Sequence, residues 1–168
     1  MSIKRDIFPL PFAICDLDSD GKDDLIAENS DPDTHMWSVA VAYGTVDGWA
    51  SPVDVTKSVM TGVMGNAPRV TCWPNSYAPG KFLVSDPGSL TSQGFLADGT
   101  VWFYDVDANQ APLLTKTLVN FDPNTNLSGF GKDLVPAGDY NGDGKPDLII
   151  GYQAGFGGLT AAWLLYGR

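Results

Sequence analysis

The chain has 168 residues, of which 43% are hydrophobic and 18% charged, a composition that fits one globular domain with a core of its own. Its formal net charge of −10 disfavours nucleic acid and anionic membranes as partners, and no apolar run approaches the ~18 residues of a membrane-spanning helix. Nineteen glycines and twelve prolines predict many turns, so we expect an all-β protein.

The first segment of the chain shows no secretory signal. Residues 1–6 carry positive charge, but Pro9 and Pro11 interrupt the apolar residues that follow. A signal peptide needs a continuous apolar region at this place. We therefore predict none.

An acidic loop follows the short apolar segment 12–15. Residues 16–24 read Asp-Leu-Asp-Ser-Asp-Gly-Lys-Asp-Asp and run into the apolar residues 25–27. Oxygen-bearing side chains at loop positions 1, 3, 5 and 9, a glycine at position 6 and the carbonyl of position 7 are what Ca²⁺ takes from one short loop. The predicted calcium ligands are Asp16, Asp18, Asp20, the carbonyl of Lys22, and Asp24.

Two more strand-like segments, 36–43 and 52–59, follow this loop. Together with 12–15 and 24–28 they form one predicted four-stranded antiparallel unit. His35 is the only histidine, and it lies in the connection before residue 36. No nucleophile motif accompanies it, so we interpret His35 as a surface residue and predict no catalytic residue.

A second unit becomes visible when Cys72 is aligned with Cys15. Its strands are expected at 69–72, 81–85, 100–106 and 112–119, with an insertion between residues 86 and 98. Trp73, Tyr77 and Lys81 stand at loop positions 1, 5 and 9, so this copy cannot hold Ca²⁺. Lys81 either supplies a charge in place of the ion or is an ordinary exposed lysine. The two cysteines could form at most one disulfide, and we expect buried free thiols.

The acidic loop returns in a third unit, 123 positions after its first occurrence. Residues 139–147 read Asp-Tyr-Asn-Gly-Asp-Gly-Lys-Pro-Asp, and strands are expected at 134–138, 147–152 and 159–166. The tyrosine and glycine at 43–44 recur at 166–167 with the same spacing from the loop. The predicted ligands are Asp139, Asn141, Asp143, the carbonyl of Lys145, and Asp147. Two Ca²⁺ per chain would bring the net charge from −10 to −6.

The EF-hand is the alternative interpretation of both loops. An EF-hand needs a bidentate glutamate at position 12 and a helix on each side of the loop. Position 12 is Ala27 in the first loop and Ile150 in the third, and the flanking segments are too short for helices. We therefore expect each cation in the turn of a β-hairpin.

Repeated four-stranded antiparallel units are typical of β-propeller blades. We expect blades at about 9–59, 66–119 and 129–168, with residues 2–7 adding a closing edge strand to the third blade, all in one domain over 1–168. Three blades cannot close a ring, because propellers have about four to eight. Either two chains form a six-bladed homodimer, or the sequence is a fragment.

The third unit resembles an FG-GAP (VCBS-type) repeat, the calcium-binding blade of integrin α-subunit heads, of bacterial surface proteins and of certain fungal propeller lectins. Phe130 and Gly131 match the "FG" pair, and residues 139–147 match the metal motif. Gly151-Tyr152-Gln153 replaces the "GAP". The first unit has the loop without the pair, and the second has only the strands. The resemblance implies a propeller with calcium in hairpin loops on one rim.

Three functions remain open from sequence. The first is a lectin-like carbohydrate-binding module, for which Trp73, Tyr77 and Tyr140 are the candidate ligand-binding residues because they lie on or beside the loops. The second is an integrin-like module for protein recognition or adhesion. The third, a calcium-dependent lyase or hydrolase, is disfavoured by the single histidine. The calcium loops favour an extracellular location, whereas the missing signal argues against it.

Overall fold

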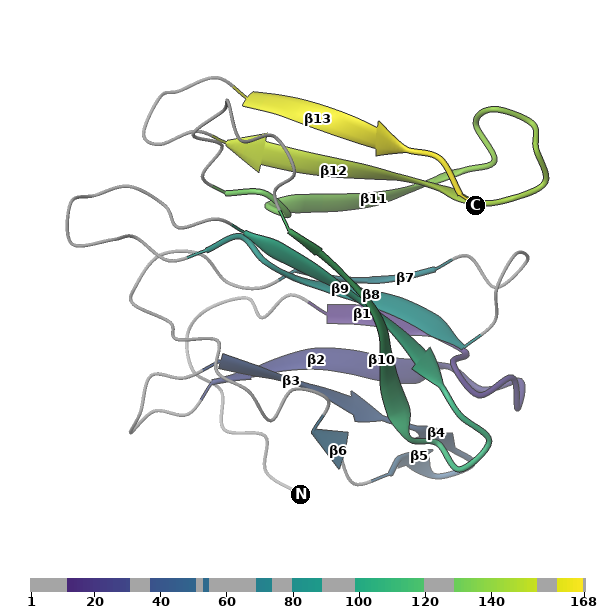
Figure 1. Cartoon of the computed structure of the whole chain (residues 1–168). Coiled ribbons are helices and arrows are strands. Elements are labelled where there is room, and N and C mark those ends of the chain that lie inside the picture. The colour runs from purple at the N-terminus through teal and green to yellow at the C-terminus, as the bar shows by residue number, and fades with distance from the viewer. Residues whose placement is uncertain are drawn as a thin grey trace.

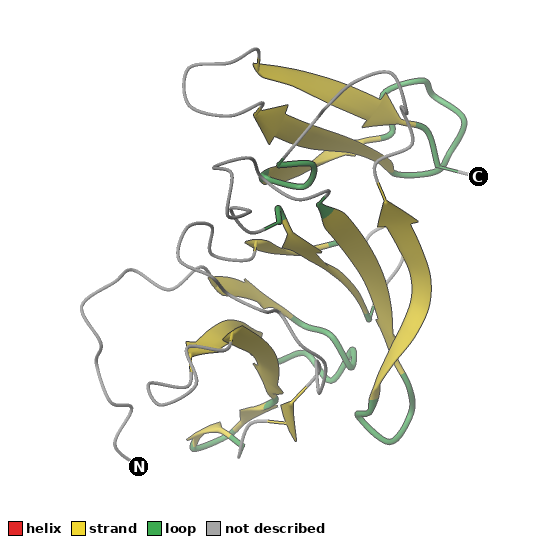
Figure 2. Cartoon of the chain, turned by 60° about the vertical axis from the view of Figure 1, so that its left-hand side comes forward, coloured by secondary structure: helices red, strands yellow, loops and turns green. Residues whose placement is uncertain are grey.

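The computed structural model describes residues 12–30, 37–50, 53–54, 69–73, 80–88, 99–119, 129–153 and 160–167. Within these residues the protein contains no helix, and hence none that could span a membrane. Three twisted antiparallel sheets lie one above the other, in the order of the sequence (Figure 1). Figure 2 shows the same three layers from a second direction. The expected all-β fold of blade-like sheets is confirmed.

The first sheet has the strand order β1-β2-β3-β6. Its strands are β1 (Phe12–Cys15), β2 (Asp24–Ser30), β3 (Trp37–Ala42) and β6 (Val53–Asp54). A small hairpin of β4 (Gly44–Thr45) and β5 (Gly48–Trp49), which the sequence did not reveal, follows β3 and precedes β6 along the chain. The antiparallel register pairs Ile14 with Leu25 and Leu25 with Ala42, so the acidic loop 16–24 is the turn of a hairpin.

The second and third sheets repeat this meander. The second contains β7 (Arg69–Cys72), β8 (Lys81–Asp86), β9 (Thr100–Val106) and β10 (Pro112–Val119). The third contains β11 (Asp133–Gly138), β12 (Asp147–Gln153) and β13 (Thr160–Leu165), without a fourth strand among the described residues. The closing strand expected at 2–7 lies outside the described residues, as do His35 and Tyr77.

Strand β8 of the second sheet is buried on both faces, because each neighbouring sheet packs against one side of it. Phe82 and Val84 of β8 belong to the core shared with the first sheet, and both are fully buried. Leu83, which points the opposite way along the same strand, belongs to the core shared with the third sheet. The continuous apolar run in β8 is therefore explained by burial on two faces.

The Phe130-Gly131 pair joins the second sheet to the third. The Phe130 side chain is fully buried in their common core. Gly131 has a φ of 87°, and a Cβ at this position would lie 2.8 Å from the Cβ of Ser85 in β8. The Ser85 hydroxyl donates a hydrogen bond of 2.5 Å to the Gly131 carbonyl. Only glycine allows the two backbones to approach this closely.

The inner strands β1 and β7 lie side by side, and a disulfide joins Cys15 to Cys72. The Cα atoms of the two cysteines are 6.3 Å apart. The expectation of free thiols is therefore wrong. Equivalent positions in successive units come together because both inner strands line the same edge of the stacked sheets, and the sequence alone did not show how close that edge brings them.

Candidate calcium loops and the cleft between sheets

The first acidic loop brings three of its predicted ligands together. Ligand oxygen atoms of Asp16, Asp18 and Asp24 all lie within 4.8 Å of one another. Oxygens bound to one Ca²⁺ at 2.3–2.6 Å from the ion are at most roughly 5 Å apart. This donor set therefore fits a calcium ion, with carboxylates as hard oxygen ligands.

Backbone amides hold these carboxylates in place. The Asp20 amide donates to Asp16 Oδ1 at 3.1 Å and to Asp18 Oδ1 at 3.2 Å, and the Gly21 amide donates to Asp16 Oδ2 at 3.0 Å. The Lys22 amide donates to Asp20 Oδ1 at 2.8 Å. The Asp20 carboxylate also bonds the Lys22 ammonium, and this bond lowers the pKa of Asp20.

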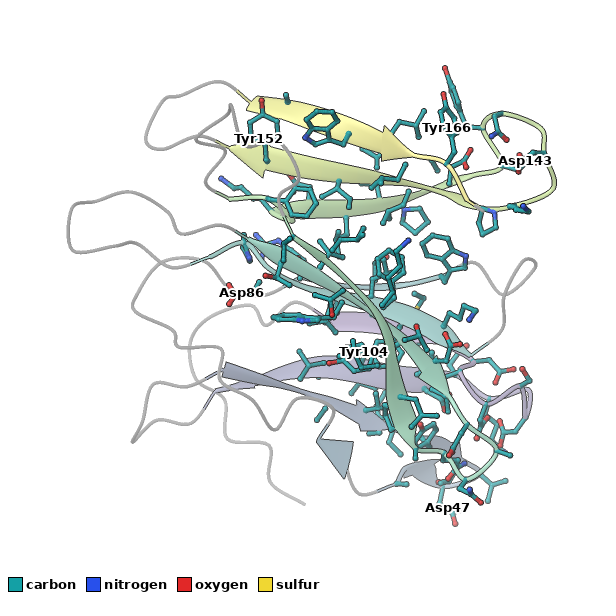
Figure 3. All side chains as sticks on the ribbon, viewed as in Figure 1. Asp47, Asp86, Tyr104, Asp143, Tyr152 and Tyr166 are labelled. Atoms are coloured by element: carbon teal, nitrogen blue, oxygen red, sulfur yellow. A yellow bond between two sulfur atoms is a disulfide. The ribbon has the colours of Figure 1, made fainter. Side chains whose placement is uncertain are left out.

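The third loop repeats this network with every partner shifted by 123 positions. The Asp143 amide donates to Asp139 Oδ1 at 2.9 Å and to Asn141 Oδ1 at 3.0 Å. The Gly144 amide donates to Asp139 Oδ2 at 2.8 Å, and the Lys145 amide to Asp143 Oδ1 at 2.9 Å. The two loops therefore have one conformation, and Figure 3 shows Asp143 at the loop end of the third sheet.

Left-handed backbone conformations close each turn. The glycines at position 6, Gly21 and Gly144, have φ angles of 83° and 82°. At position 4 the third loop has Gly142 with φ 76°, whereas the first loop has Ser19 with φ 62°. A side chain at a positive φ costs roughly 1 kcal/mol, so the first loop carries strain that the third avoids.

The aspartate at position 9 ties each loop to the end of the third strand of its unit. Asp24 is fully buried, and it accepts hydrogen bonds of 2.7 Å from the amides of both Leu17 and Gly44. Asp147 is equally buried and accepts from Tyr140 at 2.8 Å and Gly167 at 2.9 Å. Burial raises the pKa of Asp24, and the two amide donors partly oppose that rise.

Gly44 and Gly167 are site residues whose role the sequence did not reveal. A Cβ on Gly44 would lie 2.5 Å from the Asp23 carbonyl oxygen, and one on Gly167 would lie 2.5 Å from the Pro146 carbonyl oxygen. The recurring Tyr-Gly pair was the available signal. Glycine is required there because the strand end passes directly over the loop while its amide caps the buried carboxylate.

The second sheet closes over the first loop. The turn between β9 and β10 reaches across, and Gln110 Nε2 donates a 2.5 Å hydrogen bond to Asp18 Oδ2. The Asp107 carboxylate shapes this turn by accepting from the amides of Asn109 at 2.8 Å and Ala111 at 2.9 Å. Leu17 at position 2 is only 1% exposed. The loop is therefore bounded by residues of two sheets.

In the second unit an ion pair occupies the place of the position-9 aspartate. Lys81 lies opposite Asp105 in the β8–β9 register, and its Nζ is 2.5 Å from Asp105 Oδ2. The Lys81 ammonium thus has a carboxylate partner on the neighbouring strand, which neither interpretation from sequence included. Both side chains are more than a third exposed, so the pair stabilises the fold by at most about 1 kcal/mol.

A cleft of about 690 Å³ lies between the second and third sheets at the loop end. Trp73, Phe103 and Trp163 contribute aromatic walls, with the Trp73 and Phe103 ring centroids 6.0 Å apart and tilted by 55°. Lys116 Nζ lies 5.7 Å from the centroid of the Phe103 ring. Volume and lining are typical of a small-molecule site.

One of the three predicted ligand-binding residues lines this cleft. Trp73 does, whereas Tyr77 lies outside the described residues and Tyr140 is 71% exposed and not among the lining residues. Phe103 and Trp163 were missed because each looks like an ordinary core residue on its own strand.

Comparison with known protein families finds a match over the third sheet. The sequence model of the FG-GAP repeat family matches residues 130–165, from the buried Phe130 through the third acidic loop to the end of β13. The search of curated proteins found no match to the chain.

Proposed function

Residues 130–165 are an FG-GAP repeat, and from this premise we propose that the chain is a calcium-stabilised β-propeller module that binds carbohydrate. The observation that carries the binding function is the aromatic cleft between the second and third sheets. It combines flat apolar rings, which can stack on the apolar face of a sugar ring, with polar groups such as Asp105 and Thr115 at its edge.

Calcium is proposed to bind both acidic loops. The amide network that both loops share supports this proposal, as do the oxygens of Asp16, Asp18 and Asp24 in the first loop, which are spaced for one ion. When bound, the ion would neutralise carboxylates that otherwise repel one another, and it would thereby hold the hairpin in shape. Calorimetric titration should find two calcium ions per chain. Asp147→Asn should remove one, whereas Asp47→Asn, in the exposed β4–β5 turn, should leave both; a calcium-free wild type at millimolar Ca²⁺ would refute the proposal.

A glycan array tests the carbohydrate function directly. Saturable binding of a defined saccharide that Trp73→Ala weakens is the expected result. If the calcium-saturated protein binds no glycan on the array, the carbohydrate function is refuted. A folded spectrum of the variant in near-ultraviolet circular dichroism serves as the control.

Protein recognition is the second candidate. Three large apolar side chains in turns or beside them are exposed: Val46 is 87%, Trp49 53% and Tyr140 71% exposed. Exposed apolar groups of this kind favour a protein partner over a sugar when they gather into one patch. Loss of an adhesion partner on Tyr140→Ser, together with a silent glycan array, would favour this candidate.

We further propose that a second copy of the chain covers the outer face of the third sheet. In the first unit Leu17 and Tyr43 are 1% and 3% exposed because the second sheet covers them. Their equivalents in the third unit, Tyr140 and Tyr166, are 71% and 54% exposed. Two copies would supply six blades, within the range of known propellers. Sedimentation showing only 17.9 kDa particles at high concentration would refute the dimer.

An extracellular location is proposed on two grounds. The Cys15–Cys72 disulfide needs an oxidising compartment. Calcium is also abundant there, so loops of modest affinity would be filled. Recovery of the native protein with both thiols reduced would refute this location.

A further inference from the structure

We propose that the cleft between the second and third sheets selects a saccharide that carries an anionic group. The inference rests on the proposed carbohydrate function and names the chemical class within it. It starts from a contrast in charge. The whole chain has a net charge of −10. The charged residues that line the cleft, in contrast, are three lysines and one aspartate: Lys81, Lys116, Lys145 and Asp105.

The single acid in the cleft already has a partner. Asp105 is paired with Lys81 at 2.5 Å, so these two charges offset each other. The other two lysines, Lys116 and Lys145, also line the cleft, which has no second carboxylate among its lining residues. Lys145 belongs to the third acidic loop, whose three aspartates and one bound Ca²⁺ would sum to −1; Lys145 offsets that charge, and the Lys116 charge is left over. In the calcium-loaded protein the local charge at the cleft is therefore positive.

The position of Lys116 suits a sugar with an attached anion. Its Nζ lies 5.7 Å from the centroid of the Phe103 ring, and the Trp73 ring centroid lies 6.0 Å from the same centroid. A sugar ring placed against the aromatic walls would thus have an ammonium group at its edge. Lysine attracts anionic groups as a mobile point charge and does not require a planar ligand. Carboxylated and sulfated saccharides share the chemistry that this arrangement recognises.

Screening by salt makes the local charges decisive. At 0.1 M salt the Debye length is about 10 Å, so acids on distant parts of the surface contribute little to the potential in the cleft. An anion at the cleft would feel mainly Lys116, Lys145, the neutral pair Lys81–Asp105 and the calcium-loaded third loop, which together carry about +1. The net charge of −10 therefore does not argue against an anionic ligand at this one place.

The test compares sugars that differ only in charge. Calcium-saturated protein is titrated with methyl glucuronide, methyl glucoside 6-sulfate and neutral methyl glucoside, with the indole signals of Trp73 and Trp163 followed by NMR. We expect both anionic sugars to bind about tenfold more tightly than the neutral one, and the preference to shrink as salt rises from 0.05 to 0.5 M. Longer saccharides from the glycan array replace the monosaccharides if the array identifies them.

A matched pair of variants locates the effect. Lys116→Gln should reduce the preference for the anionic sugar about three- to tenfold. Lys116→Arg, which keeps the positive charge, should retain the preference. Lys132→Gln, which removes a lysine outside the cleft, should change nothing.

The outcomes separate this inference from the function on which it rests. Equal affinity for charged and neutral sugars, with the two indole signals shifted, overturns the anionic preference and leaves carbohydrate binding standing. An anionic preference that Lys116→Gln does not change overturns the assignment to this cleft. Absence of binding by every saccharide overturns the carbohydrate function and this inference together.

Discussion

Removing the Cys15–Cys72 disulfide should cost the protein a large part of its stability. The bond joins the inner strands β1 and β7, and it closes a loop of 57 residues in the unfolded chain. In the chain-entropy treatment, closing a loop of that length stabilises the folded state by roughly 4 kcal/mol, because the unfolded chain loses conformations. The double variant Cys15→Ser/Cys72→Ser should therefore unfold at lower temperature and lower urea concentration than the oxidised protein.

The expected size of the change can be measured in two ways. For a domain of this size 1 kcal/mol corresponds to roughly 2–4 °C, so the midpoint of thermal unfolding should fall by roughly 8–16 °C. Urea unfolding followed by tryptophan fluorescence gives the free energy independently. Both measurements should be made with saturating calcium, so that metal occupancy does not differ between variants.

Reduced wild-type protein is the matched control, because it lacks the bond but has no substitution. It should resemble the double variant to within about 1 kcal/mol. A loss below about 1 kcal/mol in both proteins would refute the argument, since it would mean that the two inner strands do not form this bond or that the unfolded chain keeps them together without it.

Three further predictions concern other contacts. Gln110→Ala removes the hydrogen bond to Asp18 and should weaken calcium binding at the first loop about two- to tenfold, as seen by calorimetric titration; equal weakening at the third loop would contradict it. Gly167→Ala would place a Cβ 2.5 Å from the Pro146 carbonyl oxygen, so it should lower the free energy of unfolding in urea by about 1–3 kcal/mol. A change below about 0.5 kcal/mol, which is the size expected for an ordinary surface substitution, would contradict the close approach. Burial raises the pKa of Asp86, so its contribution to stability is complete below the unfolded pKa of about 4 and is lost as pH rises through the folded pKa. In urea unfolding between pH 3 and 7, the Asp86→Asn variant should therefore lose less stability with rising pH than the wild type does. A larger loss in the variant would contradict this sign.

The strands could be predicted because their signals are local. Alternating apolar residues and Asp-Gly turns mark hairpins wherever they occur, and β1, β7, β9 and β10 begin and end where the pattern predicts. The other predicted strands that reach well into the described residues differ by one or two residues at an end. The conformation of the acidic loops is local as well, since each amide donor within a loop bonds a carboxylate at most seven positions away; the amides of Gly44 and Gly167 donate from 20 positions away.

Contacts between units could not be predicted in the same way. Gln110 lies 92 positions from Asp18, and nothing in either segment indicates that a turn of the second sheet reaches the first loop. Asp105 looks like a polar residue at a strand end until the register places it opposite Lys81. Trp73 was predicted as a ligand-binding residue because it lies beside a loop. Its ring partner Phe103 could not be predicted in this way, because it lies on another strand.

The sequence by itself determined the repeating hairpins and the acidic loops, because spacing within about nine residues sets that geometry. Only the tertiary structure decided that Cys15 meets Cys72, that the second sheet closes the first loop, and that lysines and aromatic rings from two sheets share one cleft. The physical reason is that strand period and turn chemistry act along the chain, whereas the stacking of one sheet on the next depends on how buried faces of distant segments fit together.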